Sequence, residues 1–219
     1  MRRTRWIIGL AVSNVAPFLA ASPAAAHPHV FVDAKAEMRF DAQQRVVEIQ
    51  NAWKFDAAFS AYATQGLDTD GDGNFGEAEL KPLAQENVES LKDFGFFSYL
   101  TIGSNLVALL PPKKYWLEYQ DERLTLFFVL PLEKPAALDA PAMLEIFDRE
   151  YFVEFGFPEE NALLLAGAPT CSVRHHSPES IDPQTMAILG SLPQEQRELP
   201  SDLVQAVSAL ANYFAITCR

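Results

Sequence analysis

The segment VFVDAKAEMRFD, residues 30–41, alternates apolar and polar side chains along its whole length. A period of two is typical of a β-strand that buries one face, so we expect the apolar residues of 30–40 to face a core. Residues 46–55 carry similar apolar positions after Ala42-Gln43-Gln44, a stretch that suits a turn. The two segments together predict a β-hairpin at the start of the fold.

Short apolar segments separated by turn residues continue through most of the chain and favour an antiparallel, sandwich-like β framework. The further strands that we expect are residues 97–102, 106–110, 115–119, 123–130, 143–147, 151–157, 163–166 and 171–175. Residues 177–200 are rich in Pro, Ser, Gln and Glu and predict a partly ordered linker. Residues 203–214 are apolar at helical spacing, which predicts a C-terminal helical segment.

Helical spacing also interrupts the strands, at residues 55–67 and 77–94. Pro82 lies in the first turns of the second segment, and we expect it to delay or kink the start of that helix. The fold class predicted from the whole pattern is therefore α+β, with a helix–loop–helix unit of the EF-hand type inserted at 56–95.

The loop between these helices, DTDGDGNFGEAE at residues 68–79, has an oxygen donor at each ligand position of an EF-hand calcium loop except the ninth. Gly73 occupies position 6, where the chain turns sharply, and Gly76 at position 9 leaves that place to a water. Clustered carboxylates repel one another unless a cation lies between them. The residues predicted to bind Ca²⁺ are Asp68, Asp70, Asp72, Asn74 and Glu79.

A degenerate turn that has kept its shape and lost the metal is the alternative interpretation of this loop. EF-hands that act as switches come in pairs, whereas this chain has one such loop. A single exported site belongs to the weak class, with a dissociation constant on the order of 10⁻⁴–10⁻³ M. We therefore expect a structural calcium clip and not a calcium sensor.

The first 26 residues have the pattern of a secretory signal peptide, with a basic start, an apolar stretch and Ala24-Ala25-Ala26 before the cleavage site. Cleavage after Ala26 leaves 193 of the 219 residues and changes the formal net charge from −12 to −15, because three arginines are removed. Such a charge disfavours binding to nucleic acid and anionic lipid. We expect a periplasmic protein without a membrane span in its mature chain; an uncleaved anchor helix is the alternative.

The two cysteines, Cys171 and Cys218, predict a disulfide in an oxidising export compartment. Two reduced thiols that bind a metal are the alternative. The disulfide would tie the C-terminal segment, 177–219, back to a β-rich metal-binding domain at 27–176.

The four histidines fall into two clusters, at the new N-terminus and at His175-His176. The amine and imidazole of His27 are able to chelate one metal together, and His29 and Asp33 share one face of the first strand. Such donors suit Ni²⁺, Co²⁺, Zn²⁺ or Cu²⁺. A solvated strand start is the alternative, and whether one of the second pair joins this site stays open.

Motifs of nucleophilic catalysis are missing from the sequence: there is no Gly-x-Ser-x-Gly, phosphate-binding glycine loop or His-Glu-x-x-His. Asp148 and Glu150 flank Arg149 and form a conceivable acid–base pair, although an ion-paired strand edge is the simpler interpretation. We therefore expect no enzymatic activity. A copper enzyme that uses the His27 chelate is the remaining catalytic alternative.

The chain resembles an exported bacterial family described as an uncharacterised periplasmic component of ABC-type transport systems. The resemblance rests on residues 27–33 (HPHVFVD), 53–56 (WKFD), 67–74 (LDTDGDGN), 86–95 (ENVESLKDFG) and 147–155 (FDREYFVEF). Members of that family look like proteins that are neighbours of nickel/cobalt-type permeases or are fused to them. The resemblance therefore implies an accessory role beside a separate inner-membrane metal permease or ABC transporter. A calcium-dependent interaction module without a transition-metal role is the alternative.

Overall fold

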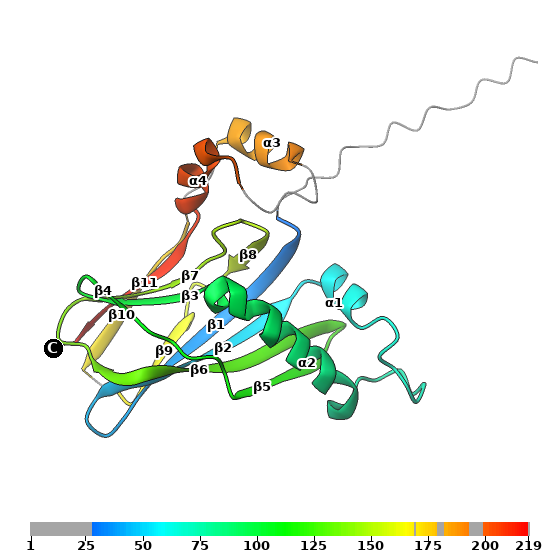
Figure 1. Ribbon diagram of the computed structural model, residues 1–219, viewed down its shortest axis with the longest axis horizontal. Coiled ribbons are helices and arrows are strands. Elements are labelled where there is room, and N and C mark those ends of the chain that lie inside the picture. Colours follow the sequence, from blue (N-terminus) through cyan, green and yellow to red (C-terminus); the bar gives the residue numbers. More distant parts are fainter. Residues whose placement is uncertain (1–27, 169, 179–181, 193–198, 219) are drawn as a thin grey trace, which may run out of the picture.

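The computed structural model describes residues 28–168, 170–178, 182–192 and 199–218, and its strands form two β-sheets (Figure 1). The first sheet contains, in spatial order, β5 (Lys114–Gln120), β6 (Arg123–Ala137), β2 (Arg45–Phe55), β1 (Val30–Phe40) and β8 (Val153–Gly156), with β9 (Leu163–Ala166) also on β1. The second contains β10 (Cys171–His176), β11 (Asn212–Cys218), β7 (Ala142–Ile146), β3 (Ser98–Ile102) and β4 (Asn105–Val107). The helices are α1 (Ala57–Ala63), α2 (Glu77–Leu91), α3 (Pro183–Ser191) and α4 (Ser201–Ser208), and a 3₁₀ segment covers Lys92–Phe97. The α+β class is confirmed.

The predicted hairpin is confirmed, because β1 and β2 pair antiparallel with Val32 opposite Phe55 and Met38 opposite Ile49. The alternating apolar residues of β1 are buried from Val30 to Met38, as the period of two requires. Trp53 of β2 lies among aromatic rings, 4.7 Å from Phe128 and 4.8 Å from Phe155 between centroids. These residues belong to one continuous core to which both sheets contribute.

The purely antiparallel framework is wrong in one place: β8 and β9 both pair with β1 in parallel. Hydrophobic alternation shows which face of a strand is buried and gives no information on the direction of its neighbour. The first sheet is therefore mixed, and the strands that extend it beyond β1 come from the second half of the chain.

The two helices beside the acidic loop are shorter than predicted. Asp56 caps the start of α1 by accepting a hydrogen bond from Phe59 N at 2.9 Å, and buried Ser60 joins α1 to β6 by accepting one from Leu124 N at 3.0 Å. Pro82 neither delays nor ends α2, because the helix begins at Glu77 and continues past it. The left-handed backbone of Gly95 and Phe96 ends the helical run beyond α2.

The C-terminal predictions need two corrections. The predicted linker contains α3, whose start is capped by the Asp182 carboxylate. The helix predicted over 203–214 ends at Ser208, and the chain then forms β11 between β10 and β7. A small second core does contain the helically spaced residues Leu203, Val207 and Leu210. Phe214 falls at the next position of that spacing by chance and belongs to β11.

Other strand bounds shift for local reasons. The predicted strand at 106–110 is the short β4, which ends at Val107, and β6 runs seven residues beyond the predicted end at Leu130. The segment predicted to extend from Tyr151 begins as a strand only at Val153, because Tyr151 has a left-handed backbone with φ of 53°. An exposed turn at residues 103–104 joins β3 to β4.

Candidate calcium loop and metal-ligating residues

The acidic loop is organised around the carboxylate of Asp68. Its Oδ1 accepts hydrogen bonds from Gly71 N at 2.8 Å and Asp72 N at 3.1 Å, and its Oδ2 accepts one from Gly73 N at 3.1 Å. A short side-chain acceptor that binds backbone N–H groups two to five residues ahead favours a tight turn over a helix. The first aspartate therefore fixes the path of the loop.

Glu79 closes the loop from the first turn of α2. Its Oε1 accepts a hydrogen bond from Thr69 N at 2.7 Å, and its Oε2 accepts one from Gly76 N at 3.0 Å. These backbone donors, Thr69 first, lower the pKa of Glu79 below its ordinary value of 4.5, so the charged carboxylate is favoured. The negative charge also lies near the N-terminus of a helix, where it is favourable.

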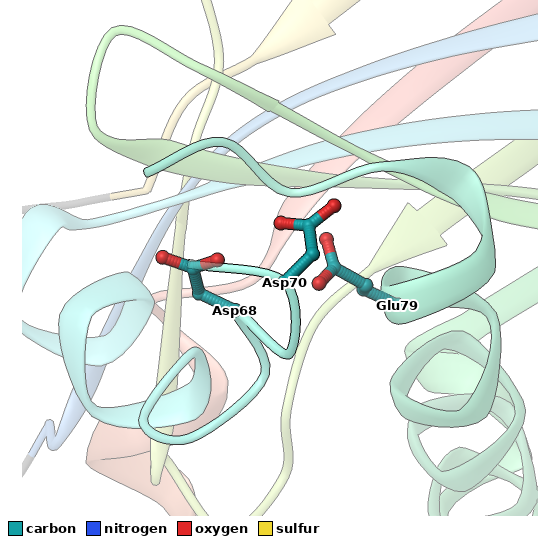
Figure 2. A group of neighbouring side chains, drawn as sticks. All are labelled: Asp68, Asp70 and Glu79. Carbon is teal, nitrogen blue, oxygen red and sulfur yellow. The ribbon is translucent and has the colours of Figure 1, made fainter. Parts of the chain in front are cut away.

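Three of the predicted calcium ligands come together in the structure. One carboxylate oxygen from each of Asp68, Asp70 and Glu79 lies within 4.8 Å of the others, and Figure 2 shows Glu79 reaching from α2 toward Asp70. Among the described residues this is the single group of three or more His, Cys, Asp or Glu side chains at such spacing. The remaining predicted ligands, Asp72 and Asn74, are joined by a hydrogen bond from Asn74 N to Asp72 Oδ1 at 2.7 Å.

Position 73 favours glycine because of its backbone conformation and not because of steric crowding. A Cβ added there would meet no heavy atom within 4 Å, so steric crowding does not require glycine. Its φ of 78° lies in the left-handed region, which side chains with a Cβ rarely adopt. Gly71 has a φ of 76° and the same explanation.

The loop is tied to the first sheet at its C-terminal half. Phe75 packs edge-on against Tyr119 of β5 with centroids 4.7 Å apart, and Leu80 of α2 is buried in the main core. These contacts join the loop to the β5 edge of the sheet and to the core beneath α2.

The N-terminal metal site falls partly outside the described residues, because His27 is among those left undescribed. His29 stacks on Phe152 with centroids 4.6 Å apart. Asp33 lies on β1, which begins one residue after His29, and its Oδ2 forms an ion pair with Arg123 Nη2 at 2.7 Å. The guanidinium and a metal ion would compete for this carboxylate.

The second histidine pair packs within the second sheet. His175 stacks on Phe214, and its Nε2 lies 3.0 Å from Asn212 Oδ1. His176 stacks on Tyr213 with centroids 4.4 Å apart. Both rings thus have contacts on β11, the strand that the sequence prediction missed.

Asp148 lies in a buried turn, where its carboxylate binds backbone N–H groups. Its Oδ1 accepts a hydrogen bond from Glu150 N at 2.9 Å, and its Oδ2 accepts two more, from Phe152 N at 3.0 Å and Val153 N at 2.9 Å. Arg149, within the same turn, forms an ion pair with Glu145 at 4.0 Å. Residue-by-residue reasoning missed this turn, although an Asp followed by several residues without strand alternation is a signal for it.

The predicted disulfide between Cys171 and Cys218 is present. It joins residues that face each other across β10 and β11, so the bond closes the end of the second sheet. This excludes the alternative of two metal-binding thiols. No helix among the described residues has the length and apolar character that crossing a membrane requires.

Comparison with known proteins places the chain in a family. The family model described as "Protein of unknown function (DUF1007)" matches residues 13–218. The chain belongs to this family. It is also 26% identical over 98 residues to the "Uncharacterized 15.5 kDa protein in trpE 3'region" of Spirochaeta aurantia, a match that covers 45% of this chain and 70% of that protein. The resemblance to a family of unknown function is thereby confirmed, and neither description assigns an activity.

Proposed function

We propose that this member of the family is an exported calcium-binding protein in which Ca²⁺ holds residues 68–79 in place. The observation that carries the proposal is the convergence of Asp68, Asp70 and Glu79 on a loop already fixed by its own backbone hydrogen bonds. Carboxylate oxygens are the ligands that Ca²⁺ prefers in proteins. The Cys171–Cys218 disulfide agrees with export to an oxidising compartment.

The proposed role of the ion is structural. The loop leads from α1 directly into α2, and α2 packs along β5 at the edge of the first sheet. A bound cation removes the repulsion among the clustered carboxylates and stabilises the folded form by linkage. With a dissociation constant on the order of 10⁻⁴–10⁻³ M, the site would fill at millimolar calcium and act as a clip.

The test compares thermal unfolding with and without 10 mM CaCl₂. We expect calcium to raise the Tm of the exported form by about 3–10 °C, from linkage at that affinity and the size of the chain. The double variant Asp68→Ala/Glu79→Ala should lose this increase. The matched control, Glu159→Ala/Glu160→Ala, removes the same charge from an exposed loop and should keep it. An equal response of both variants would contradict the proposal.

A transition-metal task in support of a separate permease is a second proposal, motivated by the histidines gathered at the mature N-terminus. His27, His29 and Asp33 would supply amine, imidazole and carboxylate donors to Ni²⁺, Co²⁺, Zn²⁺ or Cu²⁺. Adding one residue before His27 displaces the amine without changing any side chain. If binding of all four metals is the same with and without this residue, the chelate does not form and the calcium-only module remains.

A further inference from the structure

The strand β5 is an open edge of the first sheet. Its hydrogen-bonded neighbour in the sheet is β6, and residues 114–120 pair with that strand one to one, without a bulge. Among the described residues, no backbone hydrogen bond joins β5 to any other part of the chain. An edge strand directs every second N–H and C=O group away from its neighbour, so β5 offers backbone donors and acceptors on its outer side.

β5 is also the longest edge strand in the described part of the chain. It has seven residues, whereas β4 has three, β8 and β9 have four each, and β10, which the disulfide closes at one end, has six. Short strands and bulges are two means by which proteins protect a sheet edge from further pairing. β5 has neither of them.

A groove follows the outer side of β5. The helix α2 packs along this strand (Figure 1), and a hollow of about 330 Å³ is lined by Lys81 and Ala84 of the helix and by the consecutive residues 113–117. Successive residues of a strand point to opposite faces, so a hollow lined by all of them reaches the edge, where the backbone lies. A second hollow of about 590 Å³ shares Trp116 with the first and extends to Gln120. The groove is therefore as long as the strand.

The groove is positively charged at the end where β5 begins. Lys81, Lys113 and Lys114 line this end, together with one carboxylate, that of Glu77. Within the part of the chain that the structure describes, none of these lysines forms an ion pair. The whole chain has a net charge of −12, so the sign of the charge is reversed locally. An acidic ligand is attracted to this end and a basic one is repelled.

Trp116 gives the groove an aromatic wall. Its ring stacks on Phe127 with centroids 4.8 Å apart, its Nε1 donates a hydrogen bond to Glu118 Oε1 at 2.9 Å, and Lys114 Nζ lies 5.5 Å from its centroid. These contacts hold the indole in place, so it loses little conformational freedom when a ligand packs against it. Aromatic side chains of this kind contribute much of the affinity of binding surfaces.

We propose that β5 binds an extended acidic peptide segment of a partner protein, which adds to the first sheet as one further strand. Backbone hydrogen bonds with β5 supply affinity, and the three lysines select acidic side chains. Lysine on a sheet edge discourages pairing with strands that cannot neutralise it, so the same residues exclude basic segments. This function is independent of calcium binding at 68–79 and goes beyond the structural role proposed for that loop.

The test uses three acetylated and amidated peptides: the acidic EVEVTVEV, the basic KVKVTVKV, and EVEPTVEV, in which proline removes a backbone N–H and keeps every charge. Calorimetric titration of the chain without residues 1–26 should give saturable binding of EVEVTVEV, about tenfold tighter than binding of either other peptide. Equal affinity for all three peptides, or no saturable binding of EVEVTVEV, would overturn the proposal.

Two pairs of substitutions assign the selection of charge to this groove. Lys113→Gln/Lys114→Gln removes two charges from its basic end and should weaken binding of EVEVTVEV about tenfold. The matched control, Lys92→Gln/Lys134→Gln, removes the same charge from exposed positions outside the groove and should leave the affinity unchanged. Both variants are first shown to unfold cooperatively by thermal melting. An equal effect of the two pairs, or no effect of the first, would overturn the proposal.

Amide hydrogen exchange, measured by NMR, shows which backbone groups pair with the peptide. EVEVTVEV should slow the exchange of alternate amides of β5 and leave those of β4, an edge of the second sheet, unchanged. Binding without protection at residues 114–120 would overturn the proposal. A dimer of the chain, detected by sedimentation without peptide and protecting the same amides, would show that a second copy occupies this edge and would overturn it as well.

Discussion

Two aspartates in this chain form the same kind of hydrogen-bonded turn, one in an exposed loop and the other in a buried one. Asp68 and Asp148 each accept three hydrogen bonds from backbone N–H groups within the next five residues. Asp68 does so in an exposed loop, beside other carboxylates. Asp148 does so in a turn where it is 2% exposed, just before β8.

The difference shows what decides the role of such a turn. In the exposed loop, water can form hydrogen bonds with the backbone N–H groups if the carboxylate is removed. The repulsion among the clustered carboxylates is then the main unfavourable interaction, and a cation would relieve it. In the buried turn, water has little access, and the backbone N–H groups depend on the carboxylate. We therefore propose cation binding for the first turn and a structural role, holding the backbone of residues 148–153, for the second.

The largest effect that this comparison predicts is on stability without calcium. Asp148→Ala leaves three backbone N–H groups of a partly buried turn without their acceptor and should cost about 3 kcal/mol in the free energy of unfolding. Asp68→Ala should stay within about 0.5 kcal/mol, because its turn is open to water. Urea unfolding in EDTA measures both values, and equal costs would remove the distinction between the two turns.

The next effect is on the gain in Tm from calcium. Here the Asp68 variant should differ more from the unchanged chain than the Asp148 variant does. Asp148→Asn keeps the shape of the side chain, and this variant should gain as much in Tm from 10 mM CaCl₂ as the unchanged chain does, about 3–10 °C. Asp68→Asn should lose most of that gain. Thermal melts at matched ionic strength make the measurement, with MgCl₂ as the control. A calcium response lost in the Asp148 variant and kept in the Asp68 variant would refute our assignment.

A smaller effect on stability, at Gly73, tests whether the exposed loop needs glycine for its backbone conformation or for lack of space. Gly73→Ala should destabilise the calcium-free protein by about 1 kcal/mol, because φ of 78° is unfavourable for alanine although space is available. Gly73→Asn should cost less, since asparagine tolerates the left-handed region better. An alanine variant as stable as the unchanged chain would show that the loop does not hold this φ.

The smallest effect is on pH dependence. The pKa of Glu79 is lower when folded than its ordinary 4.5, so its contribution to stability is complete above pH 4.5 and is lost as the pH falls through the folded pKa. The difference in Tm between the unchanged chain and Glu79→Gln, measured in EDTA from pH 7 to pH 3, should therefore shrink at the acid end. If the difference in Tm grows as the pH falls, the pKa of Glu79 is not lowered by folding and the prediction is wrong.

Local chemistry made parts of this molecule predictable. The alternation of β1 and β2 depends on one buried face, and the acidic loop carries its predicted ligands within twelve consecutive residues. The disulfide followed from two cysteines in a chain expected to be exported.

Features that depend on distant residues could not be predicted in the same way. The parallel pairing of β8 and β9 with β1 leaves no trace in their own alternation. Leu203, Val207 and Leu210 have helical spacing, and Phe214 lies by chance at the next position of that spacing. The sequence therefore predicted a helix where the chain forms β11. A groove of about 200 Å³ between α1, α2 and the first sheet likewise takes its walls from residues as far apart as Val30 and Val153.

Calcium binding at residues 68–79 is best measured by calorimetric titration of the chain without residues 1–26, freed of metal by chelation. We predict binding of one Ca²⁺ with a dissociation constant on the order of 10⁻⁴–10⁻³ M, lost in Asp68→Ala/Glu79→Ala. A titration with millimolar CaCl₂ that shows no binding heat above dilution, at two temperatures, would contradict it.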